Sequence, residues 1–213
     1  MRSDIRTSGQ QSGSFIEAAR RTQIVDGAIA VLARNGFAAT SLAAIGEHLG
    51  MSKGLISYHF SGKAEVLNEV VRSVLAQAEA WMTPQIAGAA SFAEALRRYI
   101  ASNIGFLDTH RVEIFALTEV LSNARATPGV GEAFAVTQRD AVAGVEALFV
   151  GGQKAGEFGE FPARVAAMSL RASIDAVTTV IRDDVAFDLG EFAAGLTTIF
   201  ERASARTTQE EIA

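Results

Sequence analysis

Apolar residues recur every three to four positions along most of this chain, which is the spacing of amphipathic helices. Ile24, Ala28 and Leu32 follow that spacing within residues 17–35, and Gly36 comes soon after them. Glycine often ends a helix because it adopts left-handed backbone angles without strain. The pattern therefore predicts a first helix over residues 17–35.

Two short helices separated by a glycine are predicted next. Ser41 offers an N-cap for a helix over residues 42–49, Gly50 ends that helix, and Ser52 offers the cap for a helix over residues 53–60. One helix that braces another across a tight turn is the arrangement of a helix-turn-helix, which places its second helix in the major groove of DNA.

The second of these short helices has two unlike sides. Ile56 and Phe60 share an apolar side. The other side carries a cation, a glycine, a hydroxyl and a phenol, supplied by Lys53, Gly54, Ser57 and Tyr58. Such groups suit phosphates and base edges better than a core. The alternative is that Tyr58 packs over the first helix and that His59 bonds a neighbouring carbonyl.

The remaining apolar periodicity predicts six more helices. The first begins after Ser61 as its cap and runs to Trp81, with Pro84 as its stop. The others are expected over residues 91–108, 111–125, 128–151, 162–183 and 189–203, with Thr127-Pro128 and Pro162 as starts. No segment has the alternation of a strand, so the fold class is all-α with about nine helices.

Four segments follow from this pattern. Residues 1–14 lack periodicity and predict a flexible arm, whose Arg2 and Arg6 either reach a minor groove or stay solvated. Residues 15–62 form the helix-turn-helix domain and residues 63–203 a larger helical body. Residues 204–213 are expected to be a flexible tail.

Charge is distributed unevenly between these segments. The whole chain carries a net charge of −5, but residues 1–63 hold seven Lys or Arg against four Asp or Glu, and the rest is acidic. A positive segment joined to an acidic body suits a protein of which one end approaches phosphates. Chance clustering is the alternative.

Several function classes find no support in the sequence. Cysteine is absent, which excludes disulfides and thiolate metal sites. His48, His59 and His110 have no paired metal spacing, and no glycine-rich loop ends in the lysine-hydroxyl pair of a phosphate-binding enzyme. We expect no enzyme, no cofactor and no metal. The start of the chain lacks the apolar run of a signal peptide and no segment predicts a membrane helix, so a cytoplasmic protein is expected.

Residues 40–60 resemble the signature of the TetR-type transcriptional regulators: TSLAAIGEHLGMSKGLISYHF, followed by Lys63 and Leu67. A weaker resemblance continues at residues 156–158 and 174–176. The chain departs from the usual pattern at Gly46 and Leu49, where the family often has alanine, and at Ser57, where tyrosine is common. A serine has a shorter reach there, which puts the operator sequence in doubt rather than DNA binding.

The resemblance implies a set of DNA-contacting residues. Phosphate contacts are implied for Thr22, Thr40 or Ser41, Tyr58, His59 and Lys63. Base-facing positions are implied for Lys53, Gly54, Leu55 and Ser57, with Ser52 beside them at the start of the recognition helix. Phosphate contacts fix register while base contacts read sequence.

The resemblance also implies that residues 63–203 bind an effector and form a homodimer. Ligand-lining candidates are Trp81, Asn103, Phe106, His110, Glu113, Phe115, Thr118, Arg171 and Asp175. Dimer-interface candidates are Leu170, Ile174, Val177, Ile181, Phe192, Leu196, Ile199 and Phe200. For each ligand candidate the alternative is a surface or helix contact, and for the apolar stripes it is ordinary intramolecular core.

The expected function is that of a repressor whose dimer binds a palindromic operator and is released by a small-molecule inducer. Two alternatives stay open. One is a helical ligand-binding or interaction protein without DNA affinity, and the other is a regulator that activates.

Overall fold

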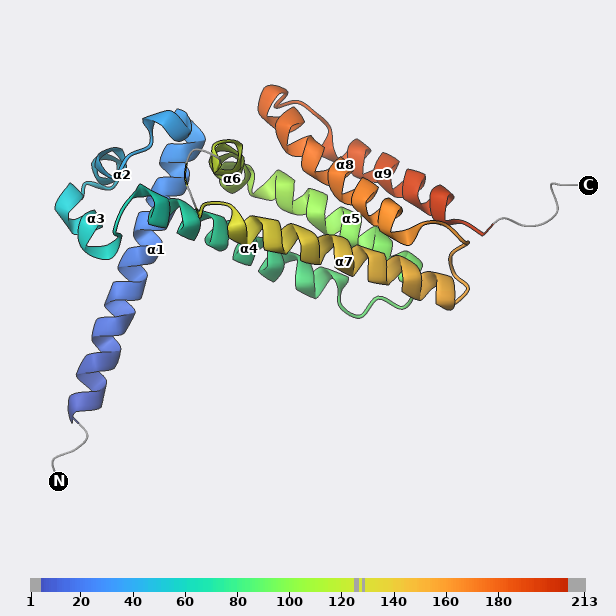
Figure 1. Cartoon of the computed structure of the whole chain (residues 1–213), viewed down its shortest axis with the longest axis horizontal. Helices are drawn as coiled ribbons and strands as arrows, with labels where there is room; N and C mark the ends of the chain where they lie inside the picture. The colour runs from blue at the N-terminus through green and yellow to red at the C-terminus, as the bar shows by residue number, and fades with distance from the viewer. Residues whose placement is uncertain (1–4, 125–126, 128, 207–213) are drawn as a thin grey trace, which may run out of the picture. The chain divides into compact units, whose positions relative to one another are not determined.

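The computed structural model describes residues 5–124, 127 and 129–206, and this part of the chain is helical, without strands (Figure 1). Its nine helices are α1 (Ile5–Ala39), α2 (Leu42–Leu49), α3 (Lys53–His59), α4 (Lys63–Ile86), α5 (Phe92–Thr109), α6 (Arg111–Ser122), α7 (Glu132–Lys154), α8 (Ala163–Asp183) and α9 (Leu189–Ser204). The predicted all-α class is confirmed. None of these helices combines the length and apolar content needed to cross a bilayer.

The described residues divide into two compact units. The first holds residues up to Val74 together with Val112–Ala133, and the second holds Leu75–Arg111 together with residues from Phe134 onward. This division differs from the expected boundary between residues 62 and 63. The physical reason is that α2 and α3 are too short to form a core alone, so the buried face of α4 up to Val74 completes it.

The core of the first unit is built from α1, α2, α3 and the start of α4, and α1, α2 and α3 contact one another. Its most deeply buried large side chains are Ile24, Leu32, Ile45, Ile56, Phe60, Val66 and Leu67. Each sits at the apolar position that the helical spacing predicts.

Two glycines with positive φ end helical segments of this unit. Gly50 ends α2 in the left-handed region (φ 65°, ψ 29°), and the Met51 N–H donates to the Gly46 carbonyl at 2.8 Å. Gly36 interrupts α1 near its end with φ 75° and ψ 174°. Both glycine stops that the sequence predicts are confirmed.

Two further glycines permit close helix packing. A Cβ atom on Gly27 of α1 would lie 2.7 Å from Leu49 Cδ1 of α2, and one on Gly46 would lie 2.6 Å from the Met51 carbonyl oxygen. The leucine at position 49 therefore fills the space that a side chain at position 27 would occupy. The departure at Leu49 from the usual alanine is thus accommodated by Gly27.

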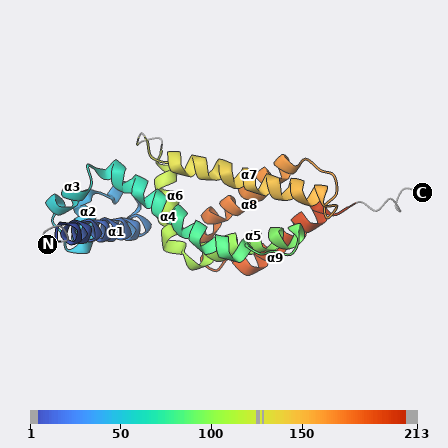
Figure 2. The same ribbon diagram turned by 90° about the horizontal axis from the view of Figure 1, so that it is seen from below.

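The second unit is a bundle in which α5, α7, α8 and α9 lie lengthwise beside one another (Figures 1 and 2). α5 packs against both α8 and α9, and an Arg97–Glu201 ion pair of 2.7 Å joins α5 to α9. Phe149 of α7 is fully buried, and its ring contacts those of Phe158, Phe161 and Phe200.

The described parts of both segments expected to be flexible include helical residues. α1 is helical from Ile5 onward, because once a helix has formed each added residue gains a backbone hydrogen bond without a new nucleation cost. Residues 1–4 and 207–213 lie outside the described part. The start of the tail is held, since the Ser204 carbonyl accepts from the Gly159 N–H at 2.9 Å.

Prolines behave differently from the prediction at two places. Pro84 lies inside α4, which continues to Ile86. Proline has no backbone N–H and cannot donate to the carbonyl four residues before it, but only two helical residues follow Pro84. α7 begins at Glu132 rather than at Pro128 because Gly129 and Gly131 adopt positive φ values of 80° and 92°. Pro128 itself lies outside the described residues.

We predict that Gly27→Ala lowers the free energy of unfolding by about 1–2 kcal/mol, because overpacking costs more than the helix propensity of alanine returns. Urea unfolding followed by circular dichroism measures it. Gly144→Ala in α7, where a Cβ meets nothing within 4 Å, is the matched control and should be neutral or stabilising. Leu49→Ala removes the side chain that overlaps the new Cβ, so the double variant should lose less stability than the sum of the two single losses. Full additivity of the two losses would contradict this prediction.

Candidate nucleic-acid interface

Helix α3 buries one side and exposes the other. Ile56 and Phe60 are 0% and 1% exposed, whereas Tyr58 is 79% exposed. Lys53, Gly54, Leu55 and Ser57 are also exposed. The predicted division of this helix into an apolar back and a polar face is therefore present in the structure.

Two serines cap the helices of the helix-turn-helix. Ser41 Oγ accepts from the Ala44 N–H at 3.1 Å at the start of α2, and Ser52 Oγ accepts from the Leu55 N–H at 3.1 Å at the start of α3. Both side chains are exposed. A capping hydroxyl retains lone-pair and donor capacity, so each serine can cap its helix and still face a phosphate.

The two threonines named from the sequence differ in exposure. Thr40 is 2% exposed, and its hydroxyl donates to the Gly36 carbonyl at 2.8 Å, which stabilises the turn between α1 and α2. Thr22 is exposed on α1, where its hydroxyl donates to the Ala18 carbonyl at 3.2 Å. Between Thr40 and Ser41, the serine is the residue at the surface.

Lys63 is turned inward rather than toward a surface. Its Nζ donates to the Phe37 carbonyl at 2.7 Å and lies 4.0 Å from the centre of the Phe37 ring. Burial lowers the pKa of this lysine. The ammonium thus joins the start of α4 to the end of α1, and the phosphate contact implied for it has no support from this geometry.

The same turn is held from α6. The Phe37 N–H donates to Glu119 Oε2 at 2.8 Å, so both peptide groups of Phe37 are engaged, one by α6 and one by α4. Glu119 was not predicted as important, because a single glutamate on a helix face carries no recognisable signal.

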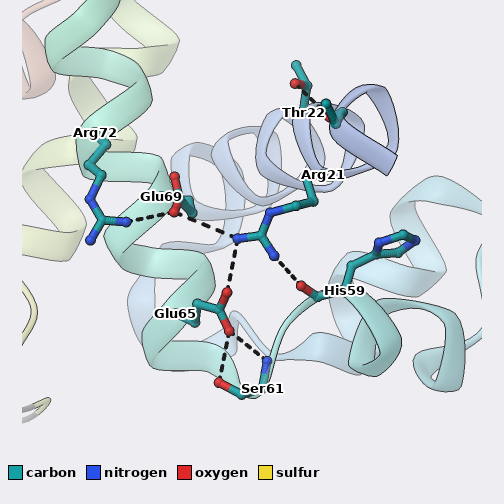
Figure 3. A network of polar contacts seen from close by, with 8 residues as sticks. Arg21, Thr22, His59, Ser61, Glu65, Glu69 and Arg72 are labelled. Atoms are coloured by element: carbon teal, nitrogen blue, oxygen red, sulfur yellow. Dashed lines mark hydrogen bonds and ion pairs between the residues drawn. The ribbon is translucent and has the colours of Figure 1, made fainter. Parts of the chain in front are cut away.

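His59 closes α3 with its ring half-buried. Its ring meets the Tyr58 ring edge-on, with 5.0 Å between centroids, and its Nδ1 atom is buried without a hydrogen-bond partner in the described structure. Its carbonyl oxygen accepts from Arg21 Nη1 (Figure 3). The backbone of His59 is thus fixed by α1.

Arg21 reaches from α1 to α3 and α4 (Figure 3). Its Nη2 lies 2.9 Å from Glu65 Oε1 and 3.7 Å from Glu69 Oε1, and its guanidinium carbon lies 4.1 Å from the centre of the Phe60 ring. From the sequence it counted only among the seven Lys or Arg of residues 1–63, because a contact 44 residues away leaves no local pattern.

Glu65 organises the start of α4. Its Oε2 accepts from both the backbone N–H and the hydroxyl of Ser61, each at 2.8 Å. These bonds, together with Arg21, lower the pKa of Glu65 to about 2. The expected cap by Ser61 is therefore reversed: the serine donates and the glutamate accepts. The sequence signal that could have predicted this role is an acidic residue in the first turn of a helix.

Three of the ligand candidates belong to one polar network of the second unit. Arg171 Nη1 donates to Asn103 Oδ1 at 2.9 Å and to the Tyr99 hydroxyl at 3.2 Å, while its Nη2 donates to Asp175 Oδ1 at 2.6 Å. Gln138 Nε2 donates to Asp175 Oδ2 at 2.8 Å. Tyr99 and Gln138 were missed from the sequence because three different helices contribute to this network.

Three aromatic candidates form a second cluster in the same unit. The His110 ring stacks on Phe106, with 4.2 Å between centroids, and meets Trp81 edge-on at 5.3 Å. Trp81 Nε1 is buried without a hydrogen-bond partner in the described structure.

The remaining ligand candidates, Glu113, Phe115 and Thr118, lie on α6 in the first unit. Thr118 donates to the Ile114 carbonyl of its own helix at 2.9 Å. Burial, together with the neighbouring Glu113 carboxylate, raises the pKa of Asp26.

Most residues expected at a dimer interface are buried within the single chain. Leu170, Ile174, Val177, Ile181, Leu196 and Phe200 are all at most 7% exposed. They form intramolecular core because α8 and α9 pack on α5. Phe192 is half-buried against Phe187, and Ile199 is 61% exposed.

Residues 24–70 match the sequence profile of the bacterial regulatory proteins of the tetR family. The regulator BetI of Vibrio atlanticus is 34% identical over 67 residues, which are 32% of this chain and 34% of that protein. The helix-turn-helix segment of this chain is therefore of the TetR type. BetI of Vibrio parahaemolyticus is 33% identical over 67 residues, and the matched segment spans about a third of the length of these curated relatives.

Solved structures share the fold of this chain over most of its length. A transcriptional regulator from Saccharomonospora viridis, solved in complex with choline, superposes with a TM-score of 0.80 at 21% identity over 89% of this chain and all of that one. A TetR-family regulator from Rhodococcus gives a TM-score of 0.76 at 18% identity over 86% and 98% of the two chains.

We predict a stability effect of Glu65 that depends on pH. Because the folded-state pKa of about 2 lies below the ordinary 4.5, the stabilisation is present above pH 4.5 and is lost as the pH falls toward 2. Glu65→Gln should therefore unfold at a lower temperature than the unmodified chain near neutral pH, and the gap should narrow on acidification through this window. A gap that stays constant would contradict the assigned pKa.

Proposed function

We propose that this chain represses transcription as a dimer that binds a palindromic operator through α3 and leaves it when a small molecule binds. The observation that carries the proposal is the exposed face of α3, with Lys53, Ser57 and Tyr58 outward while Ile56 and Phe60 are buried. A helix with this division can enter a major groove with its back held by its own domain.

The proposed dimer surface is the outward stripe of α8 and α9, not the buried one. Val165, Met168 and Val180 of α8 are 60%, 53% and 39% exposed, and Ile199 of α9 is 61% exposed. Ala172 and Ala176, also exposed, continue the stripe along α8 at helical spacing. Exposed apolar side chains in one row are typical of a subunit interface, and two-fold pairing there would present two copies of α3 to two half-sites.

Effector release is proposed as a population shift. An inducer that binds better to a wider spacing of the two recognition helices lowers operator affinity. α4 is the proposed lever, since its residues up to Val74 belong to the first unit and those from Leu75 to the second. Choline is the first compound to test, because quaternary ammonium groups bind aromatic faces and Trp81, Phe106 and His110 supply such rings.

We predict that Lys53→Ala combined with Tyr58→Ala weakens operator binding by about a hundredfold or more, since each lost contact costs roughly 1–3 kcal/mol. A gel shift on a duplex selected from a random pool, repeated across salt concentrations, measures it. Lys154→Ala, an exposed lysine of α7, is the matched control and should bind like the unmodified chain. If the unmodified chain binds without salt dependence, or not at all, the chain is a helical binding protein without DNA affinity.

A charge on the proposed dimer stripe is expected to dissociate the dimer. Met168→Asp and Ile199→Asp each place a carboxylate in an apolar contact, and sedimentation should then show monomers at concentrations where the unmodified chain is dimeric. Val185→Asp, at a position 77% exposed between α8 and α9, is the control. Dimers that persist in both stripe variants would place the interface elsewhere.

A further inference from the structure

The C-terminal end of α3 is held by Arg21, which Glu65 holds in turn; we call this pair of side chains the clamp. Arg21 donates from Nη1 to the His59 carbonyl and from Nη2 to Glu65 Oε1, while its guanidinium carbon lies over the Phe60 ring. The side chains of Arg21 and Glu65 are 32% and 35% exposed, so the pair is partly withdrawn from water. Three helices meet at this one side chain (Figure 3).

We propose that Arg21 is a positioning residue that sets the angle of the recognition helix, and that Glu65 holds Arg21 in place. The inference rests on the proposed function, DNA binding through α3. It assigns to Arg21 a role in operator affinity and discrimination without contact to DNA.

The His59 carbonyl is the right group for such a clamp. It is among the last carbonyls of α3, which have no partner within the helix. A helix C-terminus also carries partial negative charge, which attracts a cation. Arg21 therefore satisfies an unpaired acceptor and meets the favourable end of the helix dipole at once.

The shortness of α3 makes its orientation sensitive to this contact. Seven residues span about 10 Å, so a tilt of about 10° at one end displaces the other by roughly 2 Å. Hydrogen bonds to base edges tolerate only a few tenths of an ångström. Lys53 and Gly54 begin the helix at the end opposite His59, where such a tilt has its largest effect.

The charge of Arg21 is already engaged inside the domain. Glu65 and Glu69 both lie within ion-pair distance of Nη2, and Glu69 also pairs with Arg72 at 2.6 Å. Glu65 is itself fixed by the two hydrogen bonds from Ser61. An arginine surrounded in this way fixes α4 and α3 relative to α1 rather than binding phosphate.

A lysine cannot replace this arginine. The planar guanidinium donates in two directions while its face lies on an aromatic ring, whereas an ammonium is a point charge. The distances from Arg21 to Glu65 and to the Phe60 ring use both properties. Arg21→Lys therefore removes the clamp and keeps the charge.

The test compares affinities of the intact chain and its variants for a selected operator duplex and for random duplex, each normalised to the titrated active fraction. Arg21→Lys should weaken operator binding about tenfold and random binding by less than about twofold, with the salt slope unchanged. Arg34→Lys, an exposed arginine of the same helix, is the matched control and should leave the ratio of the two affinities unchanged.

Glu65→Gln separates positioning from simple electrostatics. Removing a negative charge near DNA strengthens binding if charge alone matters. The clamp predicts the opposite, a weaker operator complex. Glu47→Gln, which removes an exposed acid of α2, is the matched control and should bind as well as the unmodified chain or better.

Three outcomes overturn the inference. Arg21→Lys and Glu65→Gln could both bind the operator like the unmodified chain. Alternatively, Arg21→Gln could lower operator and random affinity in parallel with a salt slope reduced by about one, which is the signature of a phosphate contact. A lower unfolding temperature with an unchanged affinity ratio would show a purely structural role. If the unmodified chain binds the selected and the random duplex equally, the proposed function is wrong, and the inference that rests on it is wrong as well.

Discussion

The burial of Ile56 and Phe60 is the interaction on which the rest of the first unit depends. A helix of seven residues cannot persist alone in water, so α3 exists because its apolar back packs on α1 and α2. The same packing leaves Tyr58, Ser57 and Lys53 outward. One physical constraint, a short helix held by its back, thus produces both the stability of this segment and the surface offered to a partner.

Two cations of the first unit, Lys63 and Arg21, form hydrogen bonds or ion pairs between its helices. Lys63 joins α4 to the Phe37 carbonyl, and Arg21 joins α3 to α4. The positive charge counted from the sequence therefore overstates what faces outward. This distinction matters for any account of DNA binding, because a charge paired inside the domain releases no counterions from a phosphate backbone.

Helix order, both glycine stops and the polarity of α3 followed from the sequence because each depends on residues within one or two turns. The sequence did not predict three features: Pro84 inside α4, the start of α7 and the division into two units. They depend on tertiary packing or on the backbone angles of single residues. The dimer interface predicted from the sequence shows the limit of periodicity most clearly. Periodicity identified Leu170 and Ile174 as apolar, but an apolar stripe looks the same whether a neighbouring helix or a second chain covers it.

The most direct measurement is selection of bound duplexes from a random DNA pool with the intact chain. The account predicts an enriched inverted repeat, with half-sites one groove repeat or a small multiple apart, that the chain bearing Lys53→Ala and Tyr58→Ala fails to enrich. A pool that remains random after repeated rounds, or an identical motif enriched by that variant, would contradict it.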